Sequence, residues 1–120
     1  MEGRPPVWIG HAVLPVNDVN ASADFWRGIG TREVERNPQV AVLELRGGTH
    51  LVLVRGAPPG DTDAPFDIMV EDLDATHAEW KARGLDLSPI ERGRIHSSFT
   101  LRDPNGYRLQ VNSSHVVGDV

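Results

Sequence analysis

The chain reads VNDVNASADFWRGIG at residues 16–30 and VEDLDATHAEWKARG at residues 70–84, two stretches of equal length with an offset of 54 positions. Without any gap, identical residues fall at five places, which are Val16/Val70, Asp18/Asp72, Ala21/Ala75, Trp26/Trp80 and Gly30/Gly84. Average residue usage gives about one identity in a window of this length. The repeat therefore indicates that one module has been duplicated within the chain.

Each copy predicts a strand, a helix and a turn. Apolar runs rich in Val and Ile, at residues 7–16 and 66–70, are typical of strands. The helix that follows starts at a side-chain oxygen and stops at a glycine, and its tryptophan is expected to pack against a sheet. The capping candidates are Asp18 or Asn20 with Gly30 in the first copy, and Asp72 or Asp74 with Gly84 in the second.

A β-hairpin is predicted after each helix, because alternating segments flank turn-forming residues. The paired segments are residues 40–45 and 49–55 around Gly47-Gly48, and residues 98–102 and 107–112 around Asp103-Pro104-Asn105-Gly106. Superposing Gly48 on Gly106 aligns the apolar residues of one returning strand with those of the other. The duplication therefore extends through the hairpins.

The 120 residues, 39% of them hydrophobic, are interpreted as a single domain covering residues 1–120. Its first module covers about residues 7–56 and its second about residues 66–113. The proline-rich stretch 57–65 has no periodicity and is predicted to be an exposed linker. Neither module alone is expected to bury a stable core, so the modules should associate within one chain or between chains.

Composition excludes several classes of function. The 12 Lys and Arg against 17 Asp and Glu give a net charge of −5, which repels phosphate and anionic lipid, so neither nucleic acid nor membrane is expected as a partner. The absence of cysteine excludes thiol nucleophiles, cysteine-ligated metals and disulfides. No apolar run approaches the ~20 residues of a membrane span, and no signal peptide is apparent, which predicts a cytoplasmic location.

Taken together, these motifs resemble the vicinal oxygen chelate superfamily, which groups glyoxalases, bleomycin resistance proteins and extradiol dioxygenases. The residues that carry the resemblance are IGHAVLPVNDV at 9–19, FWRGIG at 25–30, GGTHLVL at 47–53, VEDLDA at 70–75, KARG at 81–84 and DPNGYRLQV at 103–111. The resemblance implies an α+β fold in which two βαβββ modules form a curled mixed sheet around a cavity, with the helices on the outer face. It also implies a small-molecule ligand and a homodimer.

The resemblance further implies four metal-ligand positions, which fall on His11, Val52, Pro65 and Gln110. Valine and proline offer no side-chain donor, whereas a zinc site usually takes three or four protein donors. Two donors do not make a tight site, so no cofactor is expected. His50 and Asp67 lie close in sequence to the two empty positions, and an unusual site that includes them stays open.

We expect the remaining polar and apolar side chains to line a ligand cavity. The ligand-binding candidates are His11, Val13, His50, Val52, Asp67, Met69, Arg108 and Gln110. Burial of apolar ligand surface, at about 25 cal/mol per Å², would supply affinity, and the polar groups would set orientation. This interpretation predicts a protein of the bleomycin-resistance type that sequesters an apolar or aromatic metabolite or antibiotic.

The alternative is an enzyme that depends on a divalent metal, namely a lyase, an isomerase or a dioxygenase. His11 and Gln110 would then be ligands, with His50 or Asp67 as the third. A catalytic base could come from His96 or Asp67. The sequence leaves both classes open, and it does not identify the ligand.

Four further residues carry expectations. His77 lies in the second helical stretch and is expected to be exposed to solvent. His115 follows the last predicted strand, and its role stays open. Trp8 and Tyr107, at a strand start and beside a turn, are candidates for contact with an aromatic ligand or with a second chain.

Overall fold

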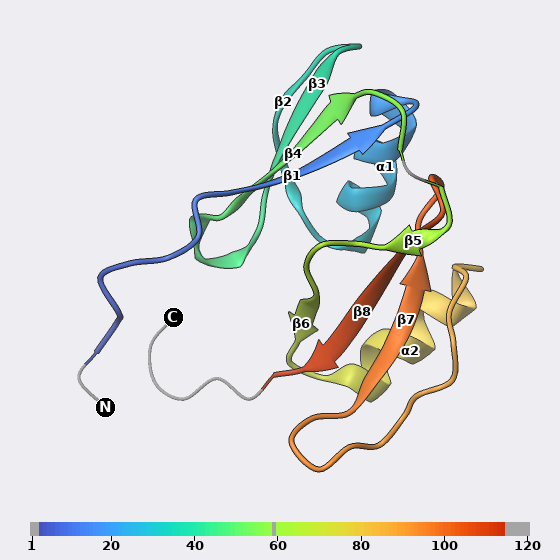
Figure 1. The fold of residues 1–120 in the computed structure, drawn as a ribbon. Coiled ribbons are helices and arrows are strands. Elements are labelled where there is room, and N and C mark those ends of the chain that lie inside the picture. Colours follow the sequence, from blue (N-terminus) through green and yellow to red (C-terminus); the bar gives the residue numbers. More distant parts are fainter. Residues whose placement is uncertain (1–2, 59, 115–120) are drawn as a thin grey trace. The chain divides into compact units, whose positions relative to one another are not determined.

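The computed structural model describes residues 3–58 and 60–114. Its elements in chain order are β1 (His11–Val16), α1 (Val19–Ile29), β2 (Arg32–Arg36), β3 (Val40–Glu44), a short 3-10 turn η1 (Arg46–Gly48), β4 (His50–Arg55), β5 (Thr62–Asp63), β6 (Ile68–Val70), α2 (Leu73–Ala82), β7 (Ser98–Arg102) and β8 (Tyr107–Ser113) (Figure 1). None of the helices in these ranges has the length and apolar character needed to cross a membrane.

These elements form two compact units, one before Gly60 and one that begins at Gly60. Each unit contains one helix and one sheet in which parallel and antiparallel pairs are mixed. The predicted α+β class with duplicated modules is confirmed.

The first unit is a βαβββ module with strand order β1-β4-β3-β2 (Figure 1). β1 and β4 are parallel, whereas the pairs β2 with β3 and β3 with β4 are antiparallel hairpins. One face of the sheet packs against α1 and is buried. The buried side chains of this layer are Leu14, Val16, Val19, Ala23, Trp26, Ala41, Leu43, Leu51 and Leu53.

The opposite face of this sheet is open. Because side chains alternate along a strand, the residues between the buried leucines point to this face. Cross-strand register places Val13 beside Val52 and Val52 beside Val42, all half-buried or exposed. A strip of valines therefore runs across three neighbouring strands.

The second unit is organised around β8. β7 pairs with one side of β8 in antiparallel fashion, and β5 and β6 pair with its other side in parallel fashion. Trp80 of α2 packs edge to face on Phe99 of β7, with ring centroids 5.9 Å apart. Trp26 and Trp80 are both buried, which confirms that each tryptophan packs its helix on a sheet.

The duplication is reproduced in individual hydrogen bonds. The Oδ1 atoms of Asp18 and Asp72 accept from the backbone N–H groups of Ala21 and Ala75, at 3.1 and 2.9 Å. At the other helix ends, Thr31 and Leu85 donate to the carbonyl oxygens of the two equivalent tryptophans, at 3.2 and 3.1 Å. Two equivalent helices therefore have equivalent caps.

Strand register repeats in the same way. Leu14 lies beside Leu53 in the first unit, and Ile68 lies beside Val111 at the equivalent place in the second. The turn after β7 also follows prediction, because the N–H of Gly106 donates to the carbonyl oxygen of Asp103 at 3.2 Å. Gly106 has φ +91°, a conformation that glycine adopts without strain.

The structure differs from the predicted elements in three places. The first strand begins at His11 rather than at residue 7, because its partner β4 begins at His50. The stretch 57–65 contains a two-residue strand, β5, that the sequence did not predict and that pairs with the start of β8. The strand of the second unit equivalent to β2 is reduced to two isolated bridges, Leu87 with Leu101 and Glu91 with Ser98.

Candidate functional site

The second unit contains a cavity of about 510 Å³ on the face of its sheet that carries Gln110. Its size lies within the ~300–1,000 Å³ range of small-molecule sites. The lining residues are Asp63, Ala64, Pro65, Phe66, Asp67, Ser88, Glu91, Ser98, Phe99, Thr100, Arg108 and Gln110. They come from the segment around β5, from the loop after α2, and from β7 and β8.

A chain of amide and carboxylate groups organises one wall of this cavity. Nε2 of Gln110 donates to Oδ1 of Asn112 at 3.0 Å, and Nδ2 of Asn112 donates to Oδ2 of Asp67 at 3.0 Å. Asn112 is buried, so these bonds satisfy an amide that would otherwise be costly to bury. The network fixes the side chains of Asp67 and Gln110 on the cavity wall.

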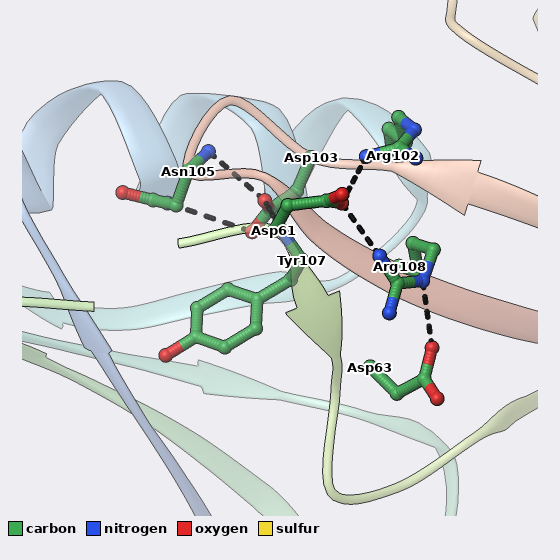
Figure 2. Close-up of polar contacts among 7 residues, drawn as sticks. All are labelled: Asp61, Asp63, Arg102, Asp103, Asn105, Tyr107 and Arg108. Carbon is green, nitrogen blue, oxygen red and sulfur yellow. Dashed lines mark hydrogen bonds and ion pairs between the residues drawn. The ribbon is translucent and has the colours of Figure 1, made fainter. Parts of the chain in front are cut away.

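Ion pairs hold the other end of the wall. Nη1 of Arg108 donates to Oδ1 of Asp61 at 2.5 Å, and its Nε donates to Oδ1 of Asp63 at 2.8 Å. Arg102 shares Asp61, with its Nη1 at 2.6 Å from the same oxygen (Figure 2). Arg108 therefore lines the cavity with its charge already compensated by two carboxylates.

These contacts shift the acid–base behaviour of the groups involved. The guanidinium of Arg102, and then that of Arg108, holds the pKa of Asp61 below its usual range. Asp63, with a further contribution from Asp61, raises the pKa of Arg108. Both shifts favour the charged forms, so Asp61 and Arg108 form an ion pair at neutral pH at the surface beside the cavity.

The cavity is mainly polar. Carboxylates of Asp63, Asp67 and Glu91 line it, and one of these, Asp63, is paired with Arg108. Phe66 supplies the aromatic part of the lining, because Phe99 is 2% exposed and its ring packs on Trp80 and His77 of α2. The lining therefore offers acceptors and negative charge together with a limited apolar surface.

The predicted ligand-binding residues fall into two groups. Asp67, Arg108 and Gln110 line the cavity of the second unit. Met69 is 48% exposed and lies beside Asn112 in register, but it is outside the cavity lining.

The other four predicted residues lie on the open face of the first unit. His11 lies beside His50 and Val13 lies beside Val52, each pair on neighbouring parallel strands. Val13 is 52% exposed. Nε2 of His50 also lies 3.1 Å from Oε1 of Glu44 on β3. Arg32, and then His50, lowers the pKa of that glutamate by hydrogen bonding.

The four metal-ligand positions implied by the resemblance do not fit a metal. Val52 and Pro65 have no side-chain donor, which leaves only His11 and Gln110 as possible ligands among the four. Within residues 3–58 and 60–114, no three His, Cys, Asp or Glu side chains are grouped in a way that could hold an ion. These four positions therefore lack the donor set that a metal-dependent step would require.

Two expectations for single residues were wrong. Tyr107 is 2% exposed, and its ring points away from the charged network, so it belongs to the core (Figure 2). His77 is half-buried rather than exposed, because its Nε2 lies 2.8 Å from the carbonyl oxygen of Ser88 and its ring packs on Phe99 at 4.8 Å.

Three other residues singled out in the sequence are Trp8, His96 and His115. Trp8 is 68% exposed, so its contact with a ligand or a second chain stays a prediction. His96 is half-buried and lies outside the cavity lining. His115 lies outside the described residues.

Five polar residues of the lining were missed by sequence reasoning, and one of them, Asp63, lies on the unpredicted strand β5. Ser98 and Thr100 lie on β7 directly opposite Asn112 and Gln110. The predicted hairpin could have revealed both, because its register follows from the turn. Ser88 and Glu91 lie in the loop after α2, where the sequence has no periodicity that predicts their position.

A chain with two such units has the architecture of proteins built from paired βαβββ modules. The chain belongs to the Glyoxalase/Bleomycin resistance protein/Dioxygenase superfamily, whose family model matches residues 8–111. This match confirms the resemblance found in the sequence. No curated protein sequence matched the chain.

Solved structures of similar fold include proteins with different activities. A lactoylglutathione lyase from Agrobacterium tumefaciens is 20% identical to this chain, with a TM-score of 0.76. The superposition covers 92% of this chain and 96% of the lyase chain. TnmS3, an antibiotic-binding protein from Streptomyces sp. CB03234, has 21% identity and a TM-score of 0.77, covering 92% and 98%. The bleomycin-binding protein of Streptomyces verticillus has 22% identity and a TM-score of 0.71, covering 93% and 100%. These likenesses concern the fold.

Proposed function

We propose that this protein binds and sequesters a small molecule, and that it does so without a catalytic metal. The observation that carries the proposal is the cavity of about 510 Å³ in the second unit, with Asp67 and Gln110 held on its wall by Asn112. A ligand-sized hollow with a few fixed polar groups is the usual form of a binding site. The lack of side-chain donors at Val52 and Pro65 supports binding rather than metal chemistry.

The lining defines the class of ligand. An aromatic or apolar part of the ligand would pack on Phe66, and hydrogen-bond donors or a positive charge would face Asp67 and Glu91. We therefore extend the predicted ligand, an apolar or aromatic metabolite or antibiotic, to an amphipathic one that carries donor groups. The open valine face around Val13 and Val52, with His11 and His50, is a second candidate ligand surface, and Val52→Ser should weaken ligand binding if this face is the site.

Thermal unfolding with a panel of aromatic antibiotics, bleomycin among them, tests the proposal. A ligand present at 100 times its Kd stabilises the folded state by about 2.7 kcal/mol, which raises the Tm measurably. Asp67→Asn and Gln110→Ala should each weaken binding of the compound found, measured by titration calorimetry. Glu79→Gln, an exposed change on α2, is the matched control. If no compound binds, or if the two cavity variants bind as tightly as the parent protein, the cavity is not the site.

The competing enzyme function makes a different prediction for the same mixtures. Under our proposal, mass spectrometry recovers the bound compound unchanged, with or without added Mn²⁺, Fe²⁺, Ni²⁺ or Zn²⁺. A product that forms only with one of these ions, and that is lost in His11→Ala and Gln110→Ala, would establish the enzyme instead.

The remaining parts of the proposal concern assembly and location. We propose a single functional domain over residues 1–120, a homodimer, and a cytoplasmic location. Light scattering after size-exclusion chromatography tests the dimer, and fractionation of the source cells tests the location.

A further inference from the structure

Asn112 determines which way the amide groups beside the cavity point. It is 4% exposed and forms hydrogen bonds to two lining residues, Asp67 and Gln110. An ionised carboxylate accepts hydrogen bonds and donates none, so the part of the Asn112 amide that faces Asp67 is its NH₂ group. Oδ1 of Asn112 then faces Gln110 and needs a donor, which Nε2 of Gln110 supplies at 3.0 Å. The charge of Asp67 therefore fixes the orientation of two amides in a row.

This orientation decides what Gln110 offers to a ligand. With Nε2 turned to Asn112, Oε1 of Gln110 accepts no hydrogen bond from the part of the chain that the structure describes. Because Gln110 lines the cavity, that oxygen can accept from a bound molecule. Asp67 adds a carboxylate to the same wall. We call Asp67, Asn112 and Gln110 the amide relay, and its cavity side offers acceptors.

The charges around the cavity favour the same class of ligand. Among the described lining residues, Asp63, Asp67 and Glu91 are acidic and Arg108 is basic. Nε and Nη1 of Arg108 already donate to Asp63 and Asp61. Within residues 3–58 and 60–114, neither Asp67 nor Glu91 forms an ion pair. A bound carboxylate would face two uncompensated charges of its own sign, whereas a protonated amine would compensate one of them.

We infer that Asn112 is a specificity-determining residue, and that the amide relay makes the cavity select a ligand with a protonated amine over one with a carboxylate. Asn112 acts as a positioning residue, because it does not line the cavity and works through the amide of Gln110. The inference rests on the proposed function, since it names the chemistry of the molecule that the cavity takes.

Three probes that share a naphthalene ring and differ in their polar group test this inference. They are naphthylmethylamine, naphthylmethanol and naphthylacetate, which carry an ammonium, a hydroxyl and a carboxylate at neutral pH. Titration calorimetry of the full-length protein at low salt should show the amine binding more tightly than the carboxylate by about 10-fold or more, the usual effect of a hydrogen bond to a charged group.

Two variants of nearly unchanged shape separate the relay from charge alone. Asp67→Asn and Glu91→Gln each remove one negative charge. Only Asp67→Asn lets the Asn112 amide turn round, because an amide at position 67 can also donate. Glu91→Gln should weaken amine binding by up to about 5-fold. Asp67→Asn should weaken it by about 10-fold and should tighten the carboxylate probe more than Glu91→Gln does, because Gln110 can then turn its NH₂ group to the cavity.

Asn112→Ala tests the positioning residue directly. It should lower the ratio of amine to carboxylate affinity and leave binding of naphthylmethanol unchanged, whereas a variant that only loosens the fold weakens all three probes equally. Circular dichroism checks that the sheet is intact. If Asn112→Ala does not fold, the comparison of Asp67→Asn with Glu91→Gln decides.

The outcomes distinguish this inference from the proposed function. Equal affinity of the parent protein for the amine and the carboxylate, or the same change of probe preference in Asp67→Asn and Glu91→Gln, would overturn the inference and leave the cavity as a binding site. If none of the three probes binds, and no antibiotic of the panel does, the proposed function is wrong and the inference falls with it.

Discussion

Asp103 shows how one buried carboxylate organises a turn. Its Oδ1 accepts hydrogen bonds from the backbone N–H groups of Asn105 and Tyr107, both at 2.9 Å (Figure 2). Burial raises the pKa of Asp103, although these hydrogen bonds oppose the shift. The residue therefore supplies acceptors that the turn needs, in an environment that disfavours its charge.

We expect Asp103→Asn to gain stability relative to the parent protein as the pH rises. Because its folded-state pKa is raised, Asp103 contributes fully to folding stability below its unfolded-state pKa. This contribution to stability is lost as the pH rises through the folded-state pKa. Asparagine keeps an oxygen for the two N–H groups and has no charge to bury. Urea unfolding across acid to neutral pH measures the difference.

The alanine variant at the same position supplies the contrast. Asp103→Ala removes the acceptor and should lose about 1–3 kcal/mol throughout the pH range. A stability difference between the Asp103→Asn variant and the parent protein that does not change with pH would contradict the raised pKa.

The bond between Asp67 and Asn112 makes a second prediction at this scale. Asp67→Ala leaves the buried amide of Asn112 without its acceptor, which should destabilise the protein by about 1–3 kcal/mol. Asp67→Asn retains an acceptor oxygen and should cost less. Equilibrium denaturation of the two variants provides the comparison, and equal stability of both would show that the bond is unimportant.

Among elements, the two helices differ little in how they begin. Asp18 and Asp72 are both N-caps, whereas the other candidates in the sequence, Asn20 and Asp74, lie inside the helices. Asp18→Ala and Asp72→Ala should each cost about 1 kcal/mol of folding free energy, because each removes the acceptor for a helical N–H. Asn20→Ala, within α1, is the control and should change stability little. Chemical denaturation would refute the equivalence of the caps if only one substitution were destabilising.

The sequence predicted elements where a local signal defines them. Caps, glycine stops and the turn at Asp103 depend on neighbouring residues, so they were correct. β5 could not be predicted, because a two-residue strand has no periodicity and exists only through pairing with β8. The same reason explains Ser88 and Glu91, whose place in the cavity depends on how a loop folds against β7.

At the scale of the whole molecule, a net charge of −5 coexists with local ion pairs on the surface. Arg32, Arg102 and Arg92 are the main causes that lower the pKa values of Glu44, Asp61 and Asp74, respectively. A lowered folded-state pKa gives stability that is complete above the unfolded-state pKa and is lost as the pH falls through the folded-state pKa.

We therefore expect stability to fall on acidification below about pH 4, the ordinary range of these carboxyl groups. All three ion pairs are accessible to solvent, so about 1 M salt should weaken the dependence by screening. Urea midpoints measured from neutral to acid pH, at low and high salt, check both points. Arg92→Gln should remove the part of the acid-dependent loss of stability that comes from Asp74. If the loss of stability at acid pH does not depend on salt, these surface ion pairs are not its cause.

The repeated register, in which Leu14 pairs with Leu53 as Ile68 pairs with Val111, has a consequence for how the chain evolved. The leucines and valines that a helix covers are constrained in both copies, because replacing one by alanine costs about 2–5 kcal/mol. The uncovered faces were free of that constraint, and selection could give histidines and valines to one copy and arginine, glutamine and asparagine to the other.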